Sequence, residues 1–271
     1  MSRIRLNRVA LGMIAVLTIA VCAVFAPVIS SHDPLETNGQ KRLALPSPEH
    51  FMGTDQLGRD ILSRVLYGGR SSLLIGFCVV SIVTLVSIPV GTFSGYYTGL
   101  DRILMRIIDG LMAFPSIIVA ITFAAMWGTG KLNIIFALSF AYFPRMTRVV
   151  RSVVLSTKEM DYVDSARVAG ATDRYILRRY ILRNALSPVI VQATFIFALA
   201  ILDEAALSFL GIGIQSPEPS WGGMINEGRN YMVVSPGLML FPGVVMLLAV
   251  MGLNILGDGL RDALDPRIKE R

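Results

Sequence analysis

The chain has 271 residues, of which 16% are charged and 54% belong to the apolar set, and its mean hydropathy is +0.61. Soluble domains carry about 25% charged residues, so this composition excludes a disordered chain and most soluble enzymes, and two cysteines exclude a disulfide framework. The net charge of +6 on so apolar a chain is typical of a membrane protein with basic cytoplasmic loops, and we predict no nucleic-acid partner.

The first predicted span covers residues 9–29, which are 21 residues without a charge. At about 1.5 Å per residue this run measures roughly 31 Å, close to the roughly 30 Å of a hydrocarbon core. Arg3, Arg5 and Arg8 precede it, as in a signal peptide. However, the apolar run exceeds the usual length of about 15 residues for such a peptide, and Pro27 makes an awkward cleavage site. We expect an uncleaved anchor.

A charged motif containing two glycines precedes the second span. Ile61 and Val65 then begin an apolar face, while Asp55/Arg59 and Asp60/Arg64 are i,i+4 pairs on a polar face. This pattern predicts an interfacial helix at the outer mouth, with its apolar side in the lipid boundary. The candidate residues of the motif are Gly53, Thr54, Asp55, Gly58, Arg59 and Asp60.

Apolar runs predict five further spans, at residues 71–100, 103–130, 132–150, 185–202 and 230–257. Gly91, Gly95 and Gly99 recur every four residues in the second span, a spacing that lets another helix approach closely. Pro89 and Pro115 lie inside apolar runs and should kink or break their helices. The fourth span is the weakest, because Arg145 and Arg148 interrupt it.

The distribution of basic residues favours keeping the fourth span. With six spans and the N-terminus inside, the internal segments contain 18 of the 25 Lys and Arg residues. Without the fourth span, the nine basic residues between Arg145 and Arg183 would lie outside, against the positive-inside tendency. We therefore predict six helices with both termini cytoplasmic.

Two acidic residues, Asp203 and Glu204, interrupt the apolar run near the outer end of the fifth span. Ionisable residues in a span are costly and are candidates for function. A proton-coupled carrier would use such a pair, and we keep this as an alternative function. No second acidic residue at the midplane completes a relay, and we expect water or a partner subunit to satisfy the pair.

Residues with catalytic or metal-binding potential are few. The chain has no H-E-x-x-H, G-x-S-x-G or Cys/His cluster. Residues 128–131 read Gly-Thr-Gly-Lys but lack the first glycine and the Ser/Thr of a phosphate loop. His32 and His50 lie 18 residues apart, which is poor spacing for a metal site. We predict no catalytic residue, bound cofactor or metal in this chain.

Two further motifs flank the fifth span. In the predicted cytoplasmic loop, about residues 151–184, a short helix, a turn at glycine and a second helix over residues 176–184 are expected. The candidate residues there are Asp164, Ser165, Ala166, Gly170, Ala171 and Arg174. Beyond the fifth span, Pro217 and Pro219 force the chain to turn, and Trp221 and Tyr231 suit a membrane interface. The candidate residues of this outer motif are Glu204, Ser208, Phe209, Leu210, Gly211, Gly213, Trp221 and Gly222.

These motifs, in this order, resemble the shorter permease subunit of ABC importers for dipeptides, oligopeptides and nickel. Residues 53–60 are similar to its G-T-D-x-L-G-R-D signature, residues 164–170 to the E-A-A loop, and residues 208–222 to its S-F-L-G-L-G…P-x-W-G run. Residues 254–267 match its ending. The resemblance covers about residues 50–268. One departure is Arg183, where the family often has proline.

The resemblance implies an all-α integral membrane protein with the six-helix, type-1 ABC importer permease fold. It would comprise a stub and first helix (1–30), an extracytoplasmic loop (31–70), the transmembrane domain (71–258) and a cytoplasmic tail (259–271). It implies a non-catalytic subunit in a bacterial or archaeal plasma membrane. The implied partners are membrane lipid, a homologous permease, an extracytoplasmic binding protein and two ATPase subunits that dock on the loop at Gly170 and bind ATP and Mg. Di- or oligopeptides are the expected substrate, with nickel or a metal chelate as the alternative.

Overall fold

The computed structural model describes residues 2–264, with side chains from residue 9 onward, and all of its long elements are helices. In chain order these are α1 (Ser2–Val24), α2 (Ala26–Ile29), η1 (Gly39–Lys41), α3 (Ile61–Tyr96), α4 (Thr98–Met112), α5 (Ser116–Trp127), α6 (Lys131–Lys158), α7 (Asp161–Val168), α8 (Asp173–Ile176), η2 (Leu177–Ile181), α9 (Leu182–Phe209), α10 (Trp221–Gly228), η3 (Arg229–Tyr231) and α11 (Gly237–Leu264).

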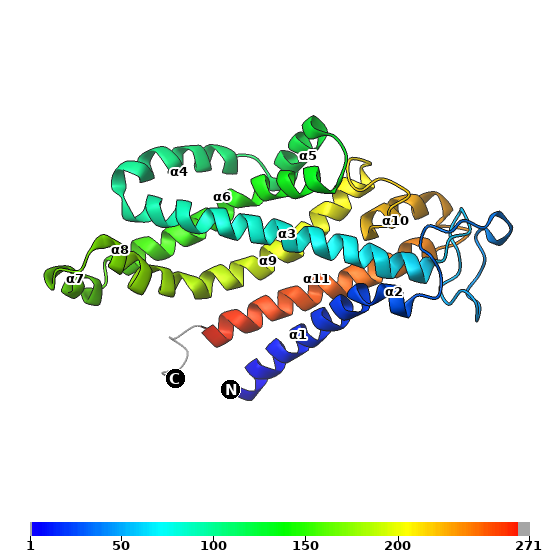
Figure 1. The fold of residues 1–271 in the computed structure, drawn as a ribbon, viewed down its shortest axis with the longest axis horizontal. Coiled ribbons are helices and arrows are strands. Elements are labelled where there is room, and N and C mark those ends of the chain that lie inside the picture. The colour runs from blue at the N-terminus through cyan, green and yellow to red at the C-terminus, as the bar shows by residue number, and fades with distance from the viewer. Residues whose placement is uncertain (1, 265–271) are drawn as a thin grey trace.

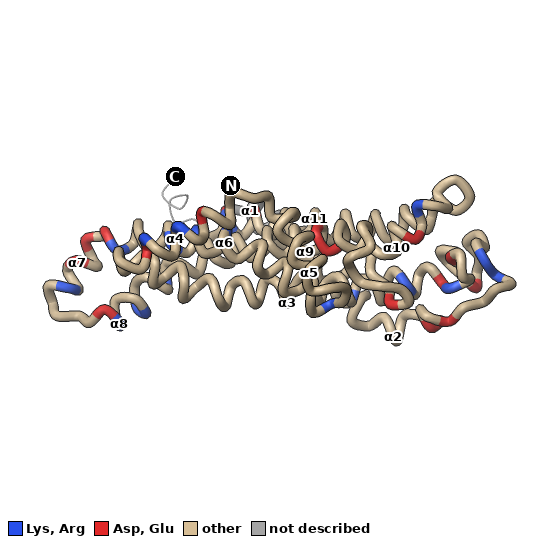
Figure 2. Tube along the Cα trace, turned by 90° about the horizontal axis from the view of Figure 1, so that it is seen from above, with Lys and Arg blue, Asp and Glu red and all other residues tan. Residues whose placement is uncertain are grey.

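The long helices form an elongated bundle (Figure 1). Helix α3 packs along α6 and α9, α9 also packs on α11, and α1 lies along α11. The loop of residues 30–60 and α10 lie at one end of the bundle, whereas α7 and α8 lie at the other, in the half where α1 begins and α11 ends (Figure 1). Charged residues gather towards the two ends, and the middle is nearly free of them apart from an acidic position on α9 (Figure 2).

Three helices are long and apolar enough to cross a membrane: α3, α11, and the continuous helix Asp173–Phe209 that contains α9. The α4 and α5 pair makes a fourth candidate if it counts as one broken span. Helix α1 has an apolar stretch, Val9–Val24, that is shorter. Helix α6 has 28 residues, and the basic residues Arg145, Arg148 and Arg151 lie within it.

The two prolines singled out in the sequence behave differently. Helices α4 and α5 meet at an angle of 88°, and Pro115 is the residue just before α5 begins, so the predicted break is confirmed. Pro89 lies inside α3, which continues to Tyr96 without interruption. A break at Pro89 is therefore excluded. The break at Pro115 agrees with its position just before α5. At the N-terminus of a helix the backbone N–H has no partner within the helix, so a proline there removes no helical hydrogen bond.

The glycine spacing in the second span marks a close helix crossing, but only for two of the three residues. A Cβ on Gly91 would lie 2.7 Å from Val150 Cβ, and a Cβ on Gly95 would lie 2.7 Å from Val154 Cβ, both on α6. Gly99 belongs to α4 and has nothing within 4 Å of its Cβ position. The predicted stripe is thus wrong at Gly99, because the chain turns at Tyr97 and Gly99 falls in the next helix, α4.

The predicted interfacial helix at the outer mouth is also wrong. Residues 53–60 form a looped segment, and the helix that follows is the first part of α3 rather than a separate element. Its apolar residues Ile61 and Val65 pack with Met224 and Leu238 inside the protein, not in lipid. Both faces of this part of α3 are buried, because α10 and the loop cover the side that carries the charges.

We predict that Gly91→Leu destabilises the helix pair α3–α6 while Gly99→Leu does not. A leucine at residue 91 must push Val150 and the Thr147 carbonyl aside, and such overpacking costs about 1–3 kcal/mol. The measurement is the free energy of unfolding of each purified variant in detergent. Equal stabilities of the two variants would contradict the assigned contact.

Candidate functional site

The first candidate site is a buried ionic cluster at the end of the bundle that carries the long loop. We define the ionic cluster as Asp55, Arg59, Arg64 and Glu227. Arg59 donates to Asp55 (Nε–Oδ2 2.6 Å) and to Glu227 (Nη2–Oε2 2.7 Å), and Arg64 donates to the same Glu227 oxygen (Nη2–Oε2 3.0 Å). Arg59 and Arg64 are each 1% exposed. Two positive and two negative charges balance, which is what burial of charge requires.

The sequence foresaw only part of this arrangement. Asp55 and Arg59 form the predicted pair, although on a turn, where Asp55 also accepts the Leu57 and Arg59 backbone N–H groups. Asp60 and Arg64 are not paired. Asp60 instead caps α3 by accepting from the backbone N–H and hydroxyl of Ser63 (both 2.8 Å), and Arg64 turns to Glu227.

The remaining residues of the first motif hold the loop in its path. Gly53 and Gly58 have φ values of +77° and +78°, and a Cβ on either would overlap a neighbouring carbonyl oxygen, that of Ala44 or Asn38. The Thr54 hydroxyl accepts from the Ala44 N–H (2.9 Å) and donates to the Lys41 carbonyl. The first motif therefore fixes the conformation of the loop that precedes α3, and the polar side chains of the motif are buried.

A second network surrounds Glu204, whose side chain is fully buried. We define the carboxylate network as Ser72, Glu204 and Ser208. The hydroxyls of Ser72 on α3 and Ser208 on α9 each donate to the Glu204 carboxylate at 2.8 Å. Asp203 accepts instead from the Tyr142 hydroxyl on α6 (2.5 Å). The expectation that water or a partner must satisfy this pair is thus wrong, since side chains of α3, α6 and α9 do so.

The outer motif closes over this network. Helix α9 ends at Phe209 with Gly211 at φ +81°, and the Ser208 hydroxyl also accepts the Ile214 N–H (3.1 Å). Gly213 and Gly222 sit where a Cβ would overlap the backbone of Ser208 and Ala205. Phe209 and Leu210, in contrast, are exposed and do not join the network.

The residue type of Trp221 suggested a membrane interface, but the side chain is buried inside the protein. It is 1% exposed, and its indole N–H donates to the Val65 carbonyl on α3 (3.0 Å). A Cβ on Gly69 of α3 would lie 2.8 Å from the Trp221 ring. The first motif and the outer motif, far apart in sequence, therefore meet on the first turns of α3.

The loop of about residues 151–184, at the opposite end of the bundle, has the predicted helix–turn–helix form. Helix α7 ends in a Schellman motif, in which the Ala171 N–H reaches the Ala166 carbonyl (2.9 Å) and Gly170 adopts φ +85°. The second helix begins at Asp173, earlier than predicted, and continues through the π-helical turn η2 into α9 without a break. Asp164, Ser165, Gly170 and Arg174 are exposed, and Ala166 and Ala171 are half-buried.

This loop is fixed to the bundle at its base and open at its tip. Val163 of α7 and Ile176 of α8 are fully buried in the main core, and Asp173 accepts from the Tyr96 hydroxyl at the end of α3 (2.6 Å). Val168, at the end of α7, is 90% exposed. Behind it, arginines line a surface cavity together with Thr172 and Tyr175; they are Arg174, Arg178, Arg179 and Arg183. An exposed apolar side chain beside a cationic surface is suited to protein binding.

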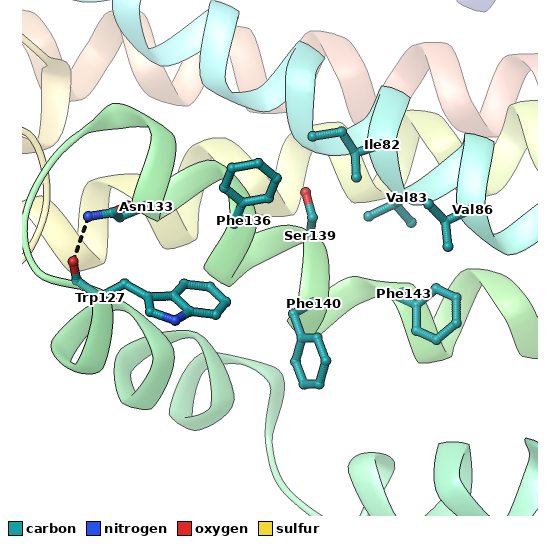
Figure 3. A pocket seen from close by; sticks show the side chains of 9 residues that line it. All are labelled: Ile82, Val83, Val86, Trp127, Asn133, Phe136, Ser139, Phe140 and Phe143. Carbon is teal, nitrogen blue, oxygen red and sulfur yellow. Dashed lines mark hydrogen bonds between the residues drawn. The ribbon is translucent and has the colours of Figure 1, made fainter.

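An apolar cavity of about 630 Å³ lies between α3, α5 and α6 (Figure 3). It is lined by Ile82, Val83 and Val86 of α3, by Phe136, Phe140 and Phe143 of α6, and by Trp127 at the end of α5. Only two polar side chains reach it. Asn133 donates to the Trp127 carbonyl (2.7 Å), and the Ser139 hydroxyl has no hydrogen-bond partner among the described residues. The cavity is large enough for a small ligand.

Three residues of these sites escaped sequence reasoning. Glu227, Tyr142 and Ser72 looked like ordinary loop or helix residues, because their partners lie elsewhere in the chain; Glu227 and Arg64 are 163 positions apart. The one signal available was charge balance. Arg59 and Arg64 needed two acidic partners, and Asp55 supplied only one once Asp60 was used as a helix cap.

Residues 87–270 match the family model "Binding-protein-dependent transport system inner membrane component". The chain belongs to this family of membrane permeases, and it is the non-catalytic membrane subunit of such a transport system. Membership confirms the family that the sequence motifs indicated, and it places the protein in the inner membrane as a multi-pass protein.

Individual relatives match over nearly the whole chain. A peptide transport system permease protein of Brucella suis biovar 1 is 45% identical over 96% of this chain and 88% of its own. A dipeptide transport system permease of Alkalihalophilus pseudofirmus is 42% identical over 98% and 88%, and a glutathione transport system permease of Pectobacterium atrosepticum is 42% identical over 96% and 87%.

A solved structure shares the fold. The MetNI methionine ABC transporter in an inward-facing conformation aligns with a TM-score of 0.61 at 19% identity, covering 74% of this chain and 96% of its own. The all-helical fold is therefore that of type-1 ABC importer membrane domains.

We predict that Glu227→Ala strongly destabilises the protein. It leaves two buried guanidinium groups short of a counter-charge, and breaking a buried pair costs about 3–5 kcal/mol. The matched control is Asp109→Ala, which removes an exposed pair with Arg148 and should cost less than about 1 kcal/mol. Unfolding free energies of the two variants test this, and a small cost at Glu227 would show that the ionic cluster contributes little.

Proposed function

We propose that this chain forms half of the translocation pathway of an ATP-driven importer for di- or oligopeptides. The observation that carries the proposal is the 40–45% identity, along nearly the whole chain, to permeases named for peptide, dipeptide and glutathione transport. Glutathione is itself a tripeptide, so these names describe one substrate class. Nickel or a metal chelate is the alternative substrate, and the transport experiment below distinguishes it from peptides.

We propose six spans with both termini cytoplasmic. The supporting observation is that α1, α3, α6, α9 and α11 run side by side, while α4 and α5 together form the remaining, broken span (Figure 1). Helix α1 begins and α11 ends in the half of the molecule that contains α7 and α8, where basic residues are abundant. In this arrangement the domains run as residues 1–30, 31–70, 71–258 and 259–271.

We propose that the cytoplasmic loop docks on an ATPase subunit through the tip of α7. Exposed Val168 would enter the partner's surface, and Arg174 and the neighbouring arginines would face acidic groups there. The partner would bind ATP and Mg. Because Val163 and Ile176 anchor the loop in the core, a pull on the tip would move α6 and α9 rather than only a flexible connection.

The remaining partners follow from the same proposal. An extracytoplasmic binding protein would deliver the substrate at the end that contains the ionic cluster. A homologous permease would complete the pathway, and the apolar cavity between α3, α5 and α6 is our candidate for part of its wall.

We expect Val168→Asp to lower both peptide uptake and transport-linked ATP hydrolysis by at least tenfold. A buried aspartate in the docking contact would be desolvated without a partner. Val168→Ile is the matched control, because it keeps an apolar side chain at the exposed tip of α7. Both variants should assemble in the membrane. Normal uptake by the Val168→Asp variant would refute docking at this tip.

The substrate is tested by reconstituting the complete importer in liposomes with ATP inside and its binding protein outside. We expect uptake of labelled di- and tripeptides and no uptake of Ni²⁺. The same liposomes with this chain alone and an imposed pH gradient test the proton-carrier alternative. Peptide uptake under that gradient without the ATPases would overturn the importer proposal.

A further inference from the structure

His50 is held in an orientation that leaves one ring nitrogen free. Its Nδ1 lies 2.9 Å from Asp60 Oδ1, and an ionised carboxylate can only accept, so Nδ1 carries the proton and Nε2 of the neutral ring presents a lone pair. The residue is 6% exposed. Its Nε2 is buried and has no hydrogen-bond partner among the described residues. A carboxylate behind a histidine in this way is the usual outer-shell support of a metal ligand.

Two further residues with metal-binding groups lie beside His50. His32 and Glu49 each place one ligand atom so that these atoms and that of His50 all lie within 4.8 Å of one another, and the two imidazole centroids are 4.7 Å apart. The three residues border a small cavity of about 100 Å³. The 18-residue spacing looked poor for a metal site, yet the two histidines lie side by side, because the loop folds back on itself between them.

The dimensions fit a metal ion after a small contraction. Bonds of about 2.0–2.1 Å in tetrahedral geometry place ligand atoms about 3.4 Å apart. His32 is half-buried and Glu49 is exposed, so both side chains can move inward, while His50 stays fixed by Asp60. Glu49 also pairs with Lys41 through Oε1, and its second oxygen, Oε2, remains for an ion.

We propose that His32, Glu49 and His50 form a binding site for a first-row divalent transition-metal ion such as Zn²⁺. Two imidazoles and one carboxylate are the ligands that these ions take, whereas Mg²⁺ and Ca²⁺ require oxygen ligands. Three protein ligands leave a fourth position for water or for a group of a partner protein.

The ion would join two segments of the extracytoplasmic loop. His32 follows α2, and His50 and Glu49 precede α3, whose first turn Asp60 caps. Ser30 already contacts Ser63 of α3 (Oγ–Oγ 2.5 Å), so the metal adds a second and stronger link at the same place. The site lies in the loop, away from the apolar cavity between the helices, and the ion is therefore a bound constituent of the outer surface. The proposal of this metal site does not depend on which substrate the protein carries.

Zinc binding to the intact complex tests the site. The complex is purified with a tag that contains no histidine, stripped with a chelator and titrated calorimetrically with Zn²⁺. Zinc binding to the other subunits is the same in every variant, so the difference between variants reports on this chain alone. The chain has two histidines, and both belong to the proposed site. We expect His32→Ala and Glu49→Gln each to weaken one zinc site per chain by at least tenfold. Glu218→Gln is the matched control, since Glu218 is also an exposed glutamate paired with a lysine, Lys131, and should leave the site unchanged.

A second measurement separates loss of the site from loss of the fold. Because an ion that binds only the folded state raises the melting temperature, Zn²⁺ should raise it in the wild type and in Glu218→Gln, but less in His32→Ala. The metal-free melting temperatures should agree, because His32 is partly exposed. Co²⁺ should in addition give a visible absorption band that is lost in His32→Ala. Equal zinc stoichiometry and affinity in wild type and His32→Ala, or no zinc site in the wild type, would overturn the proposal.

Discussion

The shared carboxylate of Glu227 is the interaction on which the outer half of the structure depends. One oxygen receives Arg59 from the loop, Arg64 from α3 and the Gln56 side-chain amide. Buried guanidinium groups are tolerated only when their charge is balanced, so loop, α3 and α10 must come together as a unit. Trp221, at the start of α10, then covers the turns of α3 that lead to the carboxylate network. Polar and charged groups are thus collected inside this end of the bundle.

The middle of the bundle relies on different physics. Towards the end of α3, Gly91 and Gly95 let α6 approach closely. Nearer the middle, buried hydroxyls satisfy the polar groups. Ser87 donates to the Phe143 carbonyl beside Pro144 (3.2 Å), and Tyr142 serves Asp203. Within lipid every such group must find a partner in the protein. Charge pairs return at the end that carries α7, where a pair between Arg151 and Asp101 (2.5 Å) joins α6 to α4.

Local features of the sequence predicted local features of the structure. Apolar runs gave the long helices, Gly170 gave the turn after α7, and Pro115 gave the break between α4 and α5, because each acts within a few residues. Pairings across the chain were not predictable in this way. Arg64 has an acidic residue four positions earlier, yet it pairs with Glu227, because Asp60 stabilises α3 better as its cap. The location of Trp221 was predicted wrongly for the same reason. Tryptophan suits both a membrane interface and a protein core, and here its contacts with α3, which is distant in sequence, bury it.

The continuity of the helix from Asp173 to Phe209 connects the two ends of the molecule. Its 37 residues form a rod of about 55 Å, with the cytoplasmic loop at one end and Glu204 near the other. The π-helical turn at Leu177–Ile181 and Pro188 are the places where such a rod bends most easily. Both lie close to the end that carries α7, so a bend there would move the long arm beyond them, with the carboxylate network, farther than the short arm.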